Sequence, residues 1–188
     1  MLHHARFAYY GLLALLERLS NYPWTSQDLR TIISQLIPDF CSFKGAVQGR
    51  MIQHPSRSFA LEITLDLVKG AEFFCHKPPI HFHVQEEYIE SIQGKMGLEL
   101  DGKEHVLSAG DGPMSIKPYV NHRSYPLSLA QQDNGETVVK FLLSGEQTDS
   151  IFELNPVFFE NWYKYQDDVV VNGARISLIQ LFSVSRLS

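Results

Sequence analysis

Apolar and polar residues follow a helical period at both ends of this chain and an extended period in the middle. Over residues 5–19 the apolar residues recur at helical spacing, and the same spacing returns between Thr25 and Pro38, which predicts two N-terminal helices. From about residue 45 apolar and polar positions alternate with a period of two, most clearly over residues 58–67, as half-buried strands do. The pattern therefore predicts a β-rich middle flanked by helices.

Glycine and proline residues divide the β-rich middle into short strands. Asp101-Gly102 is a strong two-residue hairpin turn, and residues 109–113 form a second turn. Short strands at even spacing indicate a sandwich or a barrel. The strands are predicted at residues 46–53, 58–67, 72–75, 88–92, 95–100, 103–107, 114–117, 122–125 and 137–144.

The last part of the chain is predicted to be helical. Asn155 is a helix cap, Pro156 takes the first helical position and Gly173 ends the helix, while residues 176–182 form a further short helix. The aromatic stripe of the longer helix is expected to pack on the outside of the barrel or on a second subunit; its members are Val157, Phe158, Trp162 and Tyr165.

One structural domain with three parts is expected from these patterns and from the length. A chain of 188 residues, 44% of them hydrophobic, suits one domain with a sizeable core. Its three parts are a helical N-terminal extension, a barrel, and C-terminal helices that pack on the barrel. They are expected at residues 1–44, 45–150 and 151–188.

Composition and charge limit which partners the protein can bind and where in the cell it is expected. The formal net charge of −5 and the lack of a dense Lys/Arg run argue against nucleic-acid binding. The N-terminal apolar run is too short to span a bilayer and has no signal-peptide cleavage site, so no membrane span and a cytoplasmic location are expected. Two cysteines do not make a disulfide framework, and both Cys41 and Cys75 are expected to be buried, reduced thiols.

The candidate chemistry lies in residues 81–94, HFHVQEEYIESIQG. His81 and His83 are two apart, so on one extended strand both side chains project from the same face. Glu87 can return to that face after a short polar turn, and His122 can join them if the chain folds back as antiparallel strands. Imidazole nitrogens with one carboxylate suit a divalent transition metal. The sequence therefore predicts a metal site at His81, His83, Glu87 and His122.

The same stretch resembles the first motif of the cupin superfamily, in which HxH is followed by a glutamate and then, after six intervening residues, by a glycine, here Gly94. Gly112 and Pro118 resemble the opening of the second cupin motif, which closes on His122 one residue early and without its internal glycine. The resemblance covers roughly residues 58–145, about half of the chain. It implies a jelly-roll barrel, three histidines and one glutamate as metal ligands, and a homodimer.

Two aspects of the site remain open in the sequence. Glu86 is an alternative to Glu87 as the metal-binding carboxylate, although the three-residue spacer after His83 favours Glu87. Strand parity predicts that the substrate pocket is lined by Ile89 and Ser91, together with Met96 or Leu98. No cluster of Lys or Arg points to that pocket, so a neutral and largely apolar small molecule is the expected substrate.

Three function classes follow. The first choice is an iron(II)-dependent oxygenase (a dioxygenase), with zinc, nickel, manganese or copper as other metals that the ligands suit. The second is a non-redox isomerase, cyclase or decarboxylase, in which the metal polarises a carbonyl and Glu87 acts as acid or base. The third is a ligand-binding cupin without turnover. The C-terminal helical sequence resembles that of small fungal cupins of natural-product pathways, which implies an aromatic, polyketide or terpenoid substrate in secondary-metabolite biosynthesis.

Overall fold

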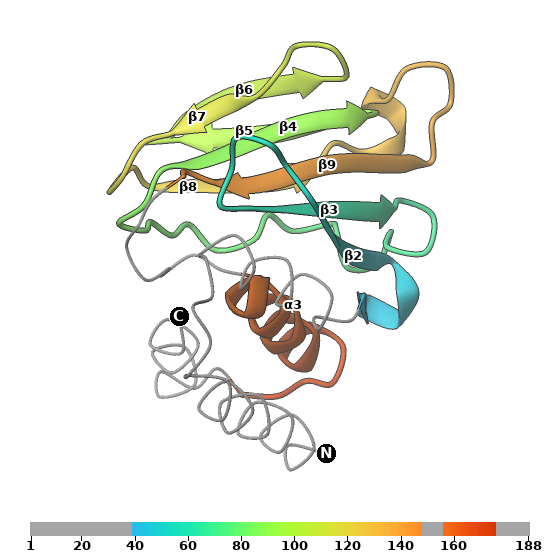
Figure 1. Cartoon of the computed structure of the whole chain (residues 1–188). Coiled ribbons are helices and arrows are strands. Elements are labelled where there is room, and N and C mark those ends of the chain that lie inside the picture. The colour runs from blue at the N-terminus through green and yellow to red at the C-terminus, as the bar shows by residue number, and fades with distance from the viewer. Residues whose placement is uncertain (1–38, 148–155, 176–188) are drawn as a thin grey trace. The chain divides into compact units, whose positions relative to one another are not determined.

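The strands of this protein form two antiparallel sheets, shown in Figure 1. The computed structural model describes residues 39–147 and 156–175. The helices predicted at residues 5–19, between Thr25 and Pro38, and at 176–182 lie outside the described residues. The described helical elements are the 3₁₀ turns η1 (Phe43–Gly45) and η2 (Leu129–Gln131) and the helix α3 (Pro156–Val170).

The larger sheet has six strands in the order β1-β2-β3-β9-β4-β7, and the smaller sheet has three in the order β6-β5-β8. The strands of the larger sheet are β1 (Phe40–Ser42), β2 (Val47–Ile52), β3 (Phe59–Asp66), β4 (Glu87–Gln93), β7 (Met114–Ile116) and β9 (Val138–Gly145). Those of the smaller sheet are β5 (Lys95–Leu100), β6 (Lys103–Ser108) and β8 (His122–Pro126). Most predicted strands therefore form close to their expected bounds.

Alternating burial explains why these strands hold one core between the two sheets. On β4 the odd-numbered residues from Glu87 to Ser91 are buried and the residues between them are only partly buried. Strand β9 lies between β3 and β4, and its Leu143 is opposite both Leu61 and Ile89. Met96 and Leu98 of the smaller sheet are fully buried in the same cluster. The predicted mainly β fold is confirmed, and its two sheets agree with a cupin jelly roll.

Three local predictions are wrong. Residues 72–75 form turns instead of a strand, because Phe73 N and Phe74 N both donate to the carbonyl of Gly70 over 2.9 Å. Residues 40–42, expected in the helical extension, form β1 and pair with β2. Both cysteines are exposed rather than buried, because Cys41 points outward from the edge strand β1 and Cys75 lies in the exposed turn.

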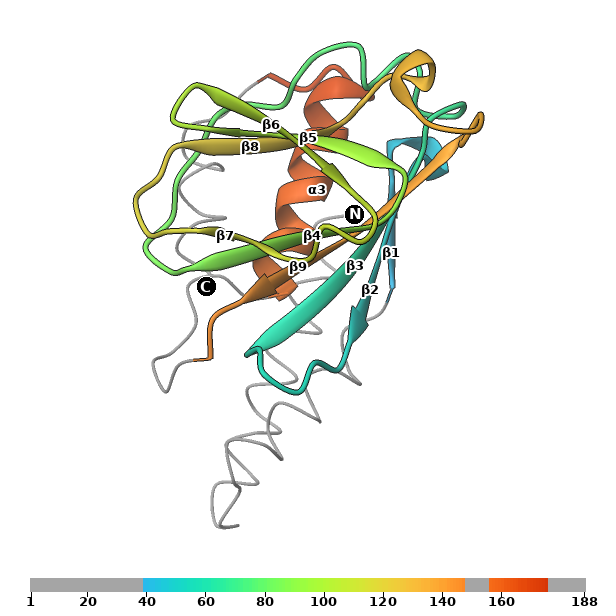
Figure 2. The ribbon, with the colours of Figure 1, turned by 90° about the horizontal axis from the view of Figure 1, so that it is seen from above.

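Helix α3 lies across one open end of the two-sheet structure. In Figure 1 it lies below the sheets, and in the perpendicular view of Figure 2, from above, it passes behind strands of both sheets. Its ring contacts are Tyr163 stacked on Phe40 at 5.4 Å and Phe159 against Phe59 at 5.6 Å, both measured between ring centroids. The predicted C-terminal helix is therefore present and packs on the larger sheet.

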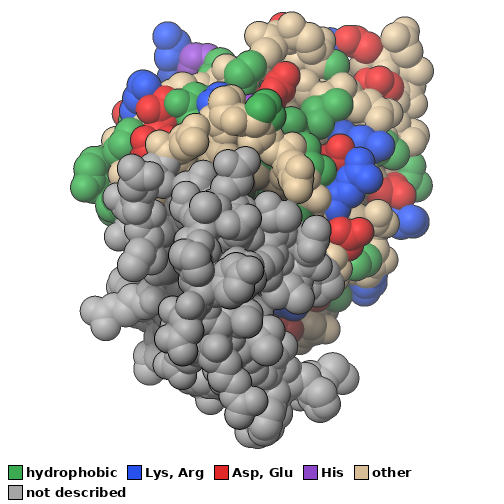
Figure 3. Space-filling model, viewed as in Figure 1, with side chains coloured by type: hydrophobic (Ala, Val, Ile, Leu, Met, Phe, Trp, Pro, Cys, Tyr) green, Lys and Arg blue, Asp and Glu red, His purple; other side chains and the backbone are tan. Residues whose placement is uncertain are grey.

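Two features of the described residues bear on a membrane span and on a charged binding surface. Among residues 39–147 and 156–175, no helix combines the length and the apolar character needed to cross a membrane. Acidic and basic side chains are mixed on the described part of the face shown in Figure 3.

Candidate metal centre

Backbone hydrogen bonds fix the segment that carries the first two histidines. His81 and His122 exchange two backbone hydrogen bonds, of 3.0 and 2.8 Å, in an isolated antiparallel bridge. The carbonyl of His83 then accepts a bond from Tyr119 N at 2.8 Å. The predicted regular strand through His81 and His83 is absent. The segment is instead held against the start of β8, which brings His122 beside the two earlier histidines.

Glu87 is the carboxylate that faces the histidines. It is the first residue of β4 and is only 3% exposed. Glu86 points the other way: its carboxylate accepts a hydrogen bond from Lys117 Nζ at 2.7 Å and another from Ser115 Oγ. The ion pair with Lys117 lowers the pKa of Glu86. Of the two glutamates left open by the sequence, Glu87 therefore lies inside and Glu86 outside.

The imidazoles of His83 and His122 point at the same oxygen. His83 Nε2 lies 3.1 Å and His122 Nε2 3.3 Å from Glu87 Oε2. On the far side of each ring, Nδ1 contacts a backbone carbonyl, Gln85 O at 2.6 Å and Val120 O at 2.9 Å. A carbonyl only accepts, so each Nδ1 carries the proton and each Nε2 presents a lone pair. Two lone pairs then face one carboxylate oxygen.

This arrangement requires a positive charge at its centre. Lone pairs and a carboxylate repel one another unless a proton or a metal ion lies between them, and His122 Nε2 is buried without a hydrogen bond of good geometry among the described residues. Ligand atoms that each lie about 2.1 Å from one metal ion are about 3 Å apart. The ligand atoms of His83, Glu87 and His122 all lie within 4.8 Å of one another. Donor type and spacing therefore fit a divalent transition metal.

The electrostatics of the cluster agree with this reading. Burial acts to raise the pKa of Glu87, but hydrogen bonding and charge from His122 and His83 outweigh it and hold that pKa at about 2. Burial acts to lower the pKa of His122, and the hydrogen bond and charge of Glu87 raise it overall. Glu87 is thus an anion at any ordinary pH, which favours a cation at this position.

His81 lies beside this cluster without being part of it. Its ring centroid is 4.3 Å from that of His122 and 6.3 Å from that of His83. Its Nδ1 is buried without a hydrogen-bond partner among the described residues. Burial, with the neighbouring His122, lowers the pKa of His81 to about 4, so this imidazole is neutral at neutral pH. The structure therefore brings together three of the four predicted ligands and keeps the fourth within ring contact.

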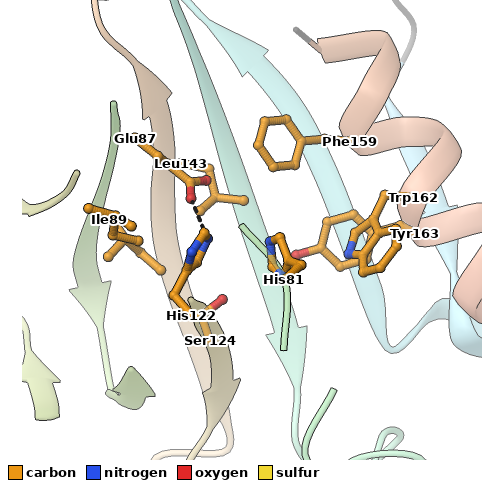
Figure 4. Close-up of a pocket in the computed structure, with 10 residues that line it drawn as sticks. His81, Glu87, Ile89, His122, Ser124, Leu143, Phe159, Trp162 and Tyr163 are labelled. Atoms are coloured by element: carbon orange, nitrogen blue, oxygen red, sulfur yellow. Dashed lines mark ion pairs between the residues drawn. The ribbon is translucent and has the colours of Figure 1, made fainter. Parts of the chain in front are cut away.

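A cavity of about 40 Å³ lies next to His81, Glu87 and His122 (Figure 4). A site for one water molecule needs about 10–15 Å³, so the cavity has room for about three waters. It is lined by His81, Glu87, Ile89, Ile116, His122, Ser124, Leu143, Phe159, Trp162 and Tyr163.

The predicted pocket residues meet this cavity only in part. Ile89 lines it, as predicted. Ser91 is buried but donates its hydroxyl to Gly94 O at 2.8 Å, and neither Ser91 nor Met96 is among the lining residues. Strand alternation correctly predicts that both side chains are buried. Ser91, however, lies two residues beyond Ile89 on β4, and Met96 belongs to strand β5 of the other sheet. Ser124, which alternation aims inward, does line the cavity.

Sequence reasoning missed the aromatic wall of the cavity. Phe159, Trp162 and Tyr163 lie on one face of α3, and the rings of Trp162 and His81 are in tilted contact with their centroids 5.5 Å apart. Trp162, one member of the predicted stripe, lines the cavity and does not lie on the outside of the barrel, while packing on a second subunit stays a prediction. Spacings of three and four residues give the signal for a shared helix face, but they do not say what that face covers.

The two facing antiparallel sheets, with His83, Glu87 and His122 brought together, agree with the fold of a cupin-type jelly roll. No protein-family profile matches the chain. It is 34% identical over 145 residues to an oxidoreductase of Arthrobotrys oligospora, and 30% identical over 148 residues to the oxidoreductase macE of Penicillium terrestre. These alignments cover 74% and 76% of this chain but 56% and 57% of the relatives, so the chain spans about half the length of the curated relatives it matches.

Two further matches have other names. The epoxidase atD of Aspergillus terreus is 32% identical over 108 residues, which is 57% of this chain and 32% of that protein. Among solved structures, KdgF from a Halomonas species matches 61% of this chain and 91% of its own length, with 18% identity and a TM-score of 0.40.

Proposed function

We propose that this chain is the metal-binding part of an oxidoreductase that acts with dioxygen on a small, largely apolar organic molecule. One observation carries the proposal: the Nε2 lone pairs of His83 and His122 converge on a single oxygen of the buried Glu87. The names of the fungal relatives, oxidoreductase and epoxidase, support a redox reaction over an isomerisation.

His83, Glu87 and His122 would hold the metal, with His81 as a fourth ligand or as a neighbour of the open positions. Iron(II), the first choice for such ligands, supplies one-electron chemistry with dioxygen when bound. The protein supplies the rest: carbonyls of Gln85 and Val120 keep both imidazoles in the right tautomer, and the carboxylate balances the charge.

The apolar part of the lining excludes water and contacts the organic molecule. Ile89 and Ile116 are each 1% exposed, and Leu143 is 5% exposed. These walls present no Lys or Arg to a charged substrate. An aromatic, polyketide or terpenoid compound of secondary metabolism fits such a lining better than a sugar phosphate or a dicarboxylate.

Metal content of the untagged protein tests the proposal first. His83→Ala and His122→Ala should each weaken metal binding at least tenfold, because loss of a direct ligand costs more than loss of a group that orients one. His76→Ala is the matched control, since His76 is exposed. Full metal retention in both ligand variants would overturn the ligand set.

Oxygen uptake then separates the function classes. Near-stoichiometric iron with substrate-dependent oxygen consumption is the expected result. Turnover that proceeds under anaerobic conditions, with zinc or manganese bound, would replace the oxygenase with an isomerase or cyclase. Light scattering on the same preparation tests the predicted homodimer. Imaging of a tagged version of the protein in its host tests the predicted cytoplasmic location.

A further inference from the structure

We infer that Trp162 is the specificity-determining residue of this site, and that the aromatic face of α3 selects a flat, unsaturated ring carrying an oxygen substituent. The inference rests on the proposed function, because it assigns the substrate class of the same cavity. It concerns the helix rather than the metal ligands, and it can be tested on the protein with and without metal.

The cavity as it stands is too small for an organic substrate. Sites for drug-sized ligands measure about 300–1,000 Å³, whereas this cavity is about 40 Å³. A substrate oxygen with one or two neighbouring atoms fits, and the rest of the molecule needs additional room. The side of the cavity that yields this room therefore decides which molecules bind.

The wall of the cavity that is formed by the sheets cannot move apart to make room for a substrate. Ile89, Ile116 and Leu143 lie on three neighbouring strands, β4, β7 and β9, which are tied together by ladder hydrogen bonds, and their side chains are almost completely buried. Interiors packed this closely resist expansion, because each displaced side chain has to displace its own neighbours.

The wall of the cavity that is formed by α3 can make room for a substrate. Trp162 lines the cavity, is only partly buried, and belongs to a helix and not to the hydrogen-bonded sheets. In Figure 4 His81 lies between His122 and the rings of Trp162 and Tyr163. A change of the Trp162 side chain opens the space next to His81 without disturbing the strands that carry Glu87 and His122.

The chemistry of that side determines the preferred ligand. A group that enters next to His81 contacts Trp162 and Tyr163 and lies near Phe159, and aromatic faces favour another flat ring in an offset or edge-to-face arrangement. The opposite end of the cavity is polar, with Glu87, His122 and the hydroxyl of Ser124. A ring bearing a hydroxyl or carbonyl oxygen matches both ends.

Phenol and cyclohexanol test the inference, because they share a hydroxyl and a six-membered ring but differ in flatness. Their dissociation constants would be measured by ligand-observed NMR on the full chain, both metal-free and loaded with Zn²⁺, which supports no redox turnover. The wild-type protein should bind phenol more tightly. Trp162→Leu should reduce this preference about three- to tenfold, the range expected for loss of one aromatic pair, whereas Trp162→Phe should keep it.

The control is Val170→Ala, on an exposed part of the same helix, which should leave the preference unchanged. Equal preference in the wild type and Trp162→Leu, or no phenol binding by the wild type up to its solubility limit, would overturn the inference. Zn²⁺ affinity, measured calorimetrically on the same samples, keeps the two proposals apart. A wild type without metal affinity contradicts the proposed function, while intact metal binding without a ring preference contradicts this inference alone.

Discussion

Acidification of the metal-free protein should reveal the buried, neutral His81. Its pKa is about 4 in the folded protein against an ordinary value of 6.5, because burial and the neighbouring His122 disfavour its charged form. A folded pKa below the unfolded one means that the unfolded chain binds the extra proton. The stability contributed by neutral His81 is therefore complete above pH 6.5 and is lost as the pH falls through 4.

The magnitude follows from the two pKa values. At pH 5 this position is almost fully protonated in the unfolded chain and mostly neutral in the folded protein. The folding equilibrium constant then falls by a factor of about 30, which corresponds to about 2 kcal/mol. His122 contributes with the opposite sign, because its pKa is raised in the folded protein. A comparison with a variant is therefore needed to isolate His81.

The assay is urea unfolding in the presence of a chelator at pH 7.5 and pH 5. His81→Phe keeps a ring beside Trp162 but has no proton to bind, so the wild type should lose about 2 kcal/mol more than this variant between the two pH values. The exposed His76→Gln should behave as the wild type does. Equal losses in the wild type and His81→Phe would refute a buried, neutral His81.

Three further substitutions test the structure around the site by thermal and urea unfolding. Gly97→Ala should cost about 1–2 kcal/mol, because its Cβ would lie 2.3 Å from the ring of Tyr125; an unchanged melting temperature would contradict this contact. Tyr119, 68% exposed, has a left-handed φ of +66°, so Tyr119→Gly should stabilise by about 0.5–1 kcal/mol while Tyr119→Ala does not. Arg123→Met removes the 2.7 Å ion pair of the nearly buried Glu99 and should cost about 2 kcal/mol, a loss that Arg123→Lys restores in part; a neutral Arg123→Met would show that the pair contributes nothing.

The local part of this architecture could be predicted from the sequence because it depends on short-range rules. The Asp101-Gly102 turn sets the register between β5 and β6, and the alternation along β4 places Glu87 and Ile89 on the buried face. These outcomes need only the period of the backbone and the chemistry of a two-residue turn.

The failures have a different origin. The turn at residues 72–75 depends on Gly70, whose missing Cβ leaves the space that the ring of Phe74 occupies. Strand β1 is only three residues long and exists because β2 offers it an edge. Neither feature has a periodic signal of its own, so a reading of hydrophobic periods does not find them.

The sequence by itself determined the donor types, their spacing and the inward parity of the strands, because backbone geometry repeats every two residues. The tertiary structure alone decided that Glu86 is paired with Lys117, that His122 meets His83 at one carboxylate oxygen, and that Trp162 lines the cavity. Each of these depends on segments that are 31 to 81 residues apart in the chain. Contacts at such separations follow from how sheets and helix pack together, and packing leaves no period in the sequence.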